Sequence, residues 1–147
     1  MMTFKNEIHM LVGQKMKTSF IKEGVQYYIN KLNEFALIKY IEPGNEKSFE
    51  KHCKTFEKDM ITIMLDVNGR QFTSETFSVT WNSLIHQRAK NISFIIGGPY
   101  GFHYKPRSDL NFSLSNLTYN HELVPLVLLE QVYRAYSIIH RRPYHHA

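Results

Sequence analysis

Residues 94–102 read "FIIGGPYGF", an apolar run that leads into a glycine-rich loop. Glycine has no Cβ, so a ligand can approach the backbone closely and bind its N–H and C=O groups. The alternative is a tight turn without a ligand, which the Gly-Gly-Pro sequence favours when it is taken alone. The loop has neither the spacing of a Rossmann fingerprint nor that of a Walker phosphate loop. Ligand binding by the backbone of residues 97–101 is therefore one of two interpretations.

The cationic side chains suggest a second kind of chemistry. Eighteen Lys and Arg against 13 Asp and Glu give a net charge of +5 and a pI of about 9.3. This balance favours a polyanionic partner such as nucleic acid. The planar guanidinium of arginine fits phosphate better than the lysine ammonium does. Arg134, Arg141 and Arg142, near the C-terminus, are therefore candidate phosphate contacts.

Cysteine and histidine argue against disulfide and metal chemistry. Cys53 is the single cysteine, which excludes an internal disulfide and fits a reducing cytoplasm. His103, His121 and His140 lack the spacing of a zinc site, so we expect no metal. No apolar run reaches the roughly 20 residues of a membrane helix, and the N-terminus has no signal-peptide pattern. We expect a cytoplasmic protein without a membrane partner.

Short apolar runs alternate with amphipathic segments along the whole chain, and each kind has its own period. Runs such as "ITIML" are apolar on both faces, which is typical of strands inside a parallel sheet. We therefore predict one α/β domain over residues 1–147, with a mainly parallel sheet. We predict strands at 7–12, 35–41, 61–65, 92–96 and within 111–117, a turn at 66–71, and helices at 18–32, 46–58, 74–88 and 122–140, the first capped by Thr18.

Three segments follow directly after predicted strands, at residues 65–66, 97–101 and 114–119. In parallel sheets, ligands bind beyond the carboxyl ends of the strands. We expect these three segments to meet at one edge of the sheet and to form a binding site there.

The second half of the chain carries a series of motifs in a fixed order. The glycine loop is followed by "FSLSNLTYNH" and then by "LLEQVYRAYSIIHRRPYHH" at the C-terminus. This series resembles the SPOUT superfamily of RNA methyltransferases. It is most similar to the small bacterial members that methylate N3 of a pseudouridine in large-subunit (23S) ribosomal RNA. The N-terminal "VGQKMKTSFIKEGVQYYINKL" also resembles this family, so the likeness covers nearly the whole chain.

The resemblance implies a C-terminal trefoil knot, a homodimer and S-adenosylmethionine as methyl donor. General topology rules would not have suggested a knot. The substrate that it implies is ribosomal RNA, and the partner that it implies is the assembled ribosome. Residues that match the family's cofactor contacts are Leu65, Gly97, Leu114, Ser115, Asn116, Leu117, Thr118 and Tyr119.

The resemblance also directs attention to the C-terminal tail. We expect His145 to act as base or proton relay, since the pKa of histidine lies near neutral, and Arg134 to stabilise charge. Tyr144 would stack on a base, and Arg141 and Arg142 would bind phosphates. Each role has a structural alternative: a solvated terminus for His145, and an ion pair with Glu130 four residues earlier on the same helix for Arg134.

The chain departs from the family at four places. Pro125 replaces an arginine early in the last helix, Asn120 replaces a proline before His121, and His146 replaces a charged residue. Residues 102–109 also differ. Two other functions therefore stay open: a non-catalytic RNA- or ribosome-binding dimer of the same fold, and a methyltransferase for a different RNA.

Overall fold

The computed structural model describes residues 5–87, 91–97 and 102–146. Its centre is a five-stranded sheet in the order β2-β1-β4-β3-β5, in which every neighbouring pair is parallel. The strands are β1 (Asn6–Val12), β2 (Ala36–Ile41), β3 (Met60–Arg70), β4 (Asn91–Ile96) and β5 (Leu110–Phe112). The helices are α1 (Ser19–Leu32), α2 (Glu46–Asp59), α3 (Ser74–Ile85) and α4 (Leu123–Ile139).

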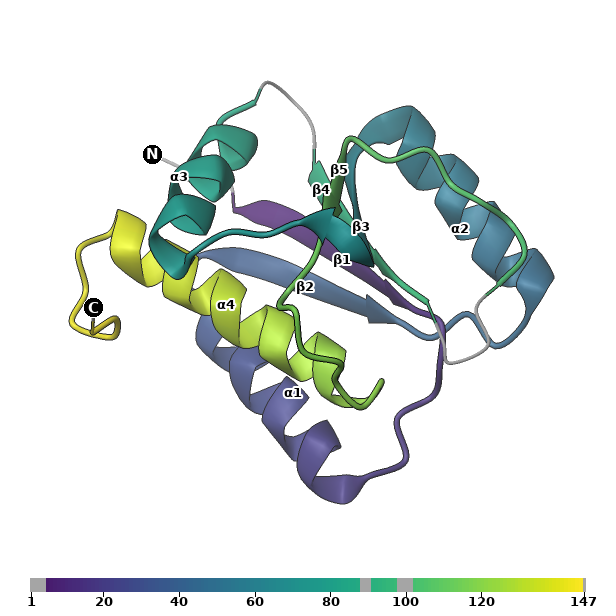
Figure 1. Cartoon of the computed structure of the whole chain (residues 1–147), viewed down its shortest axis with the longest axis horizontal. Helices are drawn as coiled ribbons and strands as arrows, with labels where there is room; N and C mark the ends of the chain where they lie inside the picture. Colours follow the sequence, from purple (N-terminus) through teal and green to yellow (C-terminus); the bar gives the residue numbers. More distant parts are fainter. Residues whose placement is uncertain (1–4, 88–90, 98–101, 147) are drawn as a thin grey trace.

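Helices cover both faces of the sheet, as Figure 1 shows: α1, α3 and α4 lie on one face and α2 lies on the other. Successive strand side chains point to opposite faces. In β1, Met10 and Val12 pack toward α1 and α4, whereas Leu11 between them packs with Phe49 and Phe56 of α2. Because both faces are covered, the central strands are mostly apolar on both sides, with the small polar residues Thr62 and Ser93 buried among them. This is the reason for the apolar runs.

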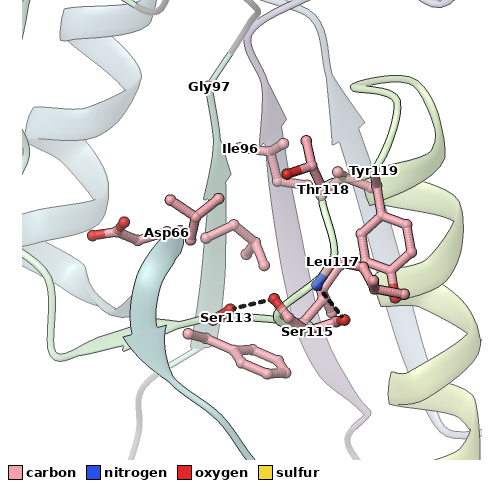
Figure 2. A pocket seen from close by; sticks show the side chains of 13 residues that line it. Asp66, Ile96, Gly97, Ser113, Ser115, Leu117, Thr118 and Tyr119 are labelled. Atoms are coloured by element: carbon pink, nitrogen blue, oxygen red, sulfur yellow. Dashed lines mark hydrogen bonds between the residues drawn. The ribbon is translucent and has the colours of Figure 1, made fainter.

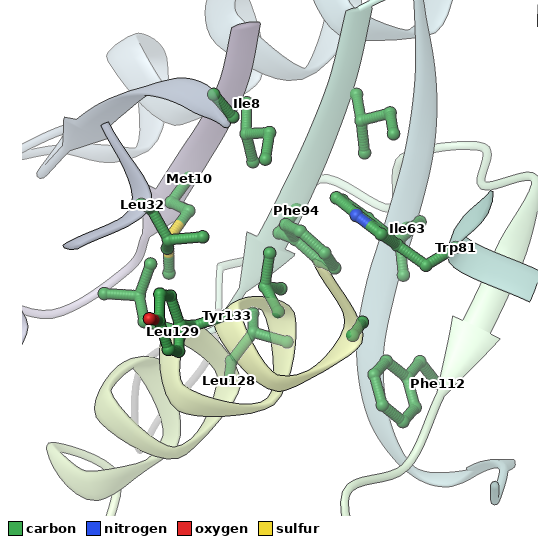
Figure 3. Close-up of a cluster of buried hydrophobic side chains, with 14 of the residues drawn as sticks. Ile8, Met10, Leu32, Ile63, Trp81, Phe94, Phe112, Leu128, Leu129 and Tyr133 are labelled. Atoms are coloured by element: carbon green, nitrogen blue, oxygen red, sulfur yellow. The ribbon is translucent and has the colours of Figure 1, made fainter. Parts of the chain in front are cut away.

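The main core lies between the sheet and α4 (Figure 3). Leu128 and Leu129 of α4 are fully buried there. Trp81 of α3 stacks on Phe94 of β4, with 5.8 Å between the ring centroids. Tyr136 meets the same indole edge-on at 5.8 Å. These large rings fix α3 and α4 against the sheet and against each other.

The predicted α/β class and parallel sheet are confirmed, and all four predicted helices are present. Helix α4 begins at Leu123, so Pro125 falls in the first turn, where a missing N–H breaks no intrahelical hydrogen bond. The knot depends on how the chain passes through residues 91–139. Residues 98–101 lie outside the described part, and the knot stays a prediction.

The turn predicted at residues 66–71 is wrong, because β3 continues to Arg70. Phe112 of β5 pairs with both Leu65 and Arg70, across an irregularity in the strand. Gly69 permits this pairing. A Cβ at Gly69 would lie 2.7 Å from the backbone nitrogen of Phe112, closer than real contacts allow. Backbone contact, and not turn geometry, therefore explains the glycine.

We expect Gly69→Ala to lower the free energy of unfolding by about 1–3 kcal/mol, because the methyl group forces β3 and β5 apart. Chemical denaturation measures the change. The matched control is Val67→Ala on the same strand, whose side chain is 74% exposed and should change stability little. Equal stability of Gly69→Ala and the wild-type chain would contradict this account of the strand pairing.

Candidate functional site

A cavity of about 160 Å³ opens at the carboxyl ends of β3, β4 and β5 (Figure 2). This is the edge at which the three strand-end segments were expected to meet. The structure places residues 65–66, Gly97 and most of residues 114–119 there, whereas residues 98–101 lie outside the described part. Seven of the eight residues assigned to cofactor binding line the cavity: Leu65, Gly97, Leu114, Ser115, Leu117, Thr118 and Tyr119. Asp66, from the predicted segment 65–66, also lines it. Five further lining residues were not singled out from the sequence: Val67, Ile96, Phe112, Ser113 and Val124.

The wall formed by residues 113–119 is shaped by hydrogen bonds within the segment (Figure 2). The Ser113 hydroxyl donates to the carbonyl of Ser115 at 3.1 Å, and the Leu117 N–H donates to Ser115 Oγ at 2.9 Å. These short-range bonds are the way serine builds turns without regular secondary structure. Asn116 is the assigned residue that does not line the cavity; it accepts a hydrogen bond from Gln71 at 2.7 Å instead.

Gly97 gives the opposite wall an open backbone. Among the described residues, no atom lies within 4 Å of the place where its Cβ would be. Apolar side chains and the hydroxyls of Ser115 and Thr118 share the rest of the lining. This mixture suits a ligand with a flat apolar part and polar ends.

A second cavity of about 330 Å³ adjoins the first and shares Leu65, Asp66 and Gly97 with it. Phe49 of α2 lines this second space. The first cavity alone is smaller than the roughly 300–1,000 Å³ usual for a cofactor-sized ligand. A nucleoside-sized ligand therefore needs space on both sides of the Gly97 backbone.

Glu122 fixes the start of α4 beside the cavity. Its carboxylate accepts hydrogen bonds from the N–H groups of Lys17 at 2.6 Å and Thr18 at 3.0 Å, and from the Thr18 hydroxyl at 2.8 Å. The predicted capping of α1 by the Thr18 side chain is wrong, because that hydroxyl donates to Glu122. The two backbone hydrogen bonds lower the pKa of Glu122 to about 2.

The other end of α4 holds the tail residues that were assigned catalytic roles. Arg134 forms the expected ion pair with Glu130, at 2.7 Å, and also donates to His145 Nδ1 at 3.0 Å. Arginine has donors only, so His145 Nδ1 is the acceptor. The other ring nitrogen, Nε2, then carries the proton and donates to Glu75 at 2.9 Å. His145 is therefore held as one neutral tautomer between two charged partners.

Tyr144 packs inward and anchors the tail. Its ring meets Tyr133 edge-on at 4.8 Å, and its hydroxyl lies 3.2 Å from the hydroxyl of Tyr28. Burial raises the pKa of Tyr144, which keeps the phenol neutral. The Arg134 guanidinium lies over the same ring, 4.8 Å from its centroid. The alternative of a solvated terminus for His145 is thus not the arrangement found, since Arg134 and Glu75 hold its ring.

The two arginines after α4 differ in their surroundings. Arg142 pairs with Glu34 at 2.6 Å and lies over the ring of Phe35. Arg141 is exposed and has a left-handed backbone with φ of 57°. Both lie at the tail end of α4, and neither lines the cavity.

The cavity and the tail lie at opposite ends of one helix. Val124 lines the cavity, and Arg134 is ten residues further along α4, which corresponds to about 15 Å. The structure therefore brings Arg134, Tyr144 and His145 together, but not with the cavity of the same chain. Glu75, the partner of His145, is 70 residues away in sequence, and no local pattern could have indicated it.

A parallel α/β sheet with a glycine-walled cavity at its carboxyl edge defines a ligand-binding α/β domain. Residues 6–145 match the family described as "Predicted SPOUT methyltransferase", and the chain belongs to this family. It is a methyltransferase by family, as the resemblance implied.

Similar proteins support the same assignment over nearly the full length. The chain is 33% identical to a protein of Christiangramia forsetii named "Ribosomal RNA large subunit methyltransferase H", over 98% of this chain and 93% of that protein. It is 33% identical to the protein of that name from Halothermothrix orenii and 38% identical to that from Dictyoglomus thermophilum, each over 95% of this chain and 99% of the other.

In the part of the chain that the structure describes, no helix is both long and apolar enough to cross a membrane. The same residues contain no cluster of three or more His, Cys, Asp or Glu side chains that could hold a metal ion.

The low pKa of Glu122 predicts a stability change in acid. The pKa falls from 4.5 to about 2 on folding, so the carboxylate stabilises the fold above pH 4.5. This contribution is lost as the pH falls from about 4.5 through 2. We expect Glu122→Gln to melt below the wild-type chain at pH 7, with a difference that shrinks over that window.

Melting temperatures at a series of pH values measure the effect. Glu23→Gln, an exposed carboxylate on α1, is the matched control and should melt like the wild-type chain throughout. A constant difference between Glu122→Gln and wild type from pH 7 to pH 2 would show that the carboxylate charge is not what stabilises this contact.

Proposed function

We propose that the protein uses S-adenosylmethionine to methylate N3 of a pseudouridine in large-subunit ribosomal RNA, on the assembled ribosome and in the cytoplasm. The observation that carries the proposal is the cavity at the carboxyl edge, which seven of the assigned cofactor residues line, in a chain of the SPOUT methyltransferase family. The names of the similar proteins support a ribosomal RNA as the substrate.

The lining fits S-adenosylmethionine. The apolar side chains of Leu65, Leu117 and Val124 suit the adenine ring. The Ser115 and Thr118 hydroxyls and the open backbone at Gly97 suit the ribose and the amino-acid part. When bound, this cofactor supplies a methyl group on a sulfonium that an attacking nitrogen can take. The work of the chain is to hold the two reactants in line, which is where proximity contributes most.

The basic tail completes the site from a second copy of the chain. Arg134 lies about 15 Å along α4 from the cavity of its own chain, and His145 is bound to it there. In a homodimer, the tail of one copy can reach the cavity of the other. Two large exposed side chains on α1, Phe20 at 64% and Tyr27 at 54%, support an interface on this side of the molecule.

N3 of pseudouridine carries a proton that must leave before or during methyl transfer. We assign its acceptance or relay to His145 and the stabilisation of the resulting charge to Arg134. In the free chain these two residues bind each other. When the RNA binds, the Arg134 guanidinium would leave His145 and turn toward the pseudouridine. Nδ1 of His145 would then have a free lone pair that can accept the proton. To stack on RNA, Tyr144 would have to leave its packing against Tyr133 and Tyr28. Arg141 would bind phosphate directly, and Arg142 would do so by exchanging its partner Glu34.

The alternative of a non-catalytic dimer depended on Pro125 and on the altered tail. Pro125 lies in the first turn of α4 and leaves the helix continuous to Ile139. Tyr144 and His145 are held by Tyr28, Arg134 and Glu75. Neither departure from the family therefore distorts the assigned groups. A methyltransferase for another RNA differs from the main proposal in its substrate only.

Cofactor binding is the first point to test. S-adenosylmethionine at 100 times its dissociation constant should stabilise the fold by about 2.7 kcal/mol, which raises the melting temperature. Gly97→Ala has room for its methyl group among the described residues, so we expect an unchanged melting temperature without cofactor and a reduced shift with it.

Val79→Ala is the control: its side chain is 72% exposed on α3 and away from the cavity, so its shift should equal that of the wild-type chain. Absence of a shift in the wild-type chain would refute cofactor use. A full melting shift in Gly97→Ala would show that the cofactor does not bind against the backbone of Gly97.

Methyl transfer is tested with ribosomes from a strain that lacks the enzyme, labelled cofactor, and mass spectrometry of the modified RNA fragment. We expect one methyl group on a large-subunit pseudouridine. Deletion of residues 142–147 should abolish transfer while the cofactor-induced melting shift remains, because the tail is distant from the cavity of its own chain. Full activity of the truncated chain would refute a site completed by the partner's tail. Methyl incorporation into another RNA would show that the proposed substrate is wrong.

A further inference from the structure

Helix α2 carries three stripes of different chemistry. Phe49, Cys53 and Phe56 are buried at helical spacing and pack on the sheet. On the opposite side, exposed lysines recur at i, i+4, i+7 and i+11, which places them on one helical face. We call this face the lysine ridge; it consists of Lys47, Lys51, Lys54 and Lys58 and spans about 16 Å.

Two acidic residues of α2, Glu46 and Glu57, lie between these two stripes and bind another segment of the chain. Residues 102–109, here called the strap, run along α2 (Figure 1). Glu46 accepts a hydrogen bond from the N–H of Tyr104 at 2.8 Å. Glu57 accepts one from the Tyr104 hydroxyl at 3.1 Å and one from the N–H of Arg107 at 2.7 Å. The carboxylates of Glu46 and Glu57 are therefore bound to the strap, and the lysines project from the outward face of α2.

The strap extends the positive surface. Phe102, Tyr104 and Pro106 are partly buried, and Phe102 stacks on Phe49 at 4.3 Å. His103, Lys105 and Arg107 alternate with them and are exposed. The ammonium of Lys54 lies 5.8 Å from the centroid of the Tyr104 ring, which places the ridge beside the strap. Five lysines and an arginine thus share one surface.

The lysine ridge begins near the two cavities and runs away from them along α2. Helix α2 follows the carboxyl end of β2 and leads into the start of β3, so its first turn lies at the edge of the sheet where the ligand cavities open. Phe49 lines the second cavity together with Lys105 of the strap. Lys47 therefore lies near the edge of the sheet where the cavities open, and Lys58 lies at the far end of α2.

We propose that the lysine ridge and the strap bind the phosphate backbone of the RNA substrate and hold it along α2, apart from the groups that carry out the reaction. The identification of the ligand as RNA rests on the proposed function, whereas the positive surface is a feature of the structure. A solvated helix usually mixes both charge signs along one face. The line of the four ridge lysines contains no acidic residue, and Glu50 pairs with Lys54 from beside it.

A protein partner fits this surface less well. Protein interfaces are depleted in lysine and rely on buried aromatic or aliphatic anchors. The large exposed apolar residues in the described part of the chain are Phe20, Tyr27, Leu37, Val67, Val79 and Leu117, and none belongs to α2 or the strap. Lysine and arginine are the usual contacts to phosphate, which fix position without reading sequence.

The test compares two variants that lose the same charge. The ridge variant combines Lys47→Gln, Lys51→Gln and Lys58→Gln, and keeps Lys54 because it pairs with Glu50 at 3.5 Å. The control combines Lys5→Gln, Lys17→Gln and Lys22→Gln, three exposed lysines outside α2 that form no ion pair within the described part of the chain. Fluorescence anisotropy gives the affinity for a labelled single-stranded RNA of mixed sequence over a range of salt concentrations, and sedimentation gives the affinity for ribosomal particles.

Three lost phosphate contacts should reduce the slope of log affinity against log salt by about 2 and weaken RNA binding at least about tenfold. The control variant should keep both values, and lysine-to-arginine changes at the ridge positions should also keep them. Because all six lysines are exposed, both variants should melt like the wild-type chain.

Three results would overturn the proposal: a ridge variant that binds RNA like the wild-type chain, an equal loss in the control, or a loss seen with ribosomal particles but not with free RNA. The last result would assign the ridge to a ribosomal protein. Methylation by the wild-type chain is measured in parallel. If it fails while the ridge variant loses RNA affinity, the proposed reaction is wrong and the ridge stands.

Discussion

The burial of α4 is the constraint on which the rest of the structure depends. Its side chains Leu128, Leu129 and Val132 fill the space between the sheet, α1 and α3, so the helix can neither slide nor rotate without opening the core. The same helix places Val124 at the cavity and Arg134 at the tail. A rigid helix fixes these two groups about 15 Å apart. A single chain of this fold therefore cannot bring its own tail to its own cavity without unpacking its core.

The sequence predicted the elements better than the contacts between them. Continuous apolar runs indicated β3 and β4, and a mostly apolar run indicated β1, because a strand covered on both faces has no fully polar side. The extension of β3 to Arg70 was missed because Gly69 looks like a turn residue, while its cause is backbone contact with Asn111 and Phe112 across the strand pair. The order of the strands, with β4 between β1 and β3, has no local signal at all.

The candidate site divides in the same way. The segments after the strands could be expected at one edge, because the carboxyl ends of parallel strands meet there. The contacts that hold the tail could not be expected. Glu75 reaches His145 from another helix, and Glu122 reaches Thr18 across 104 residues. Such pairs are set by tertiary packing, so spacing in the sequence carries no information about them.

In the proposed function, different parts of this small chain bind the RNA backbone and select the nucleotide. Lysines along α2 can only sense phosphate, which is the same at every position of an RNA. In the proposed function, the cavity residues face the cofactor, and Arg134, Tyr144 and His145 would contact a single base. Selectivity for one pseudouridine then has to come from the shape of the surrounding RNA, since too few side chains remain to read its neighbours. An assembled ribosome presents one fixed shape where free RNA presents many. The size of the chain is thus a physical reason to expect the particle, and not the naked RNA, as the better substrate.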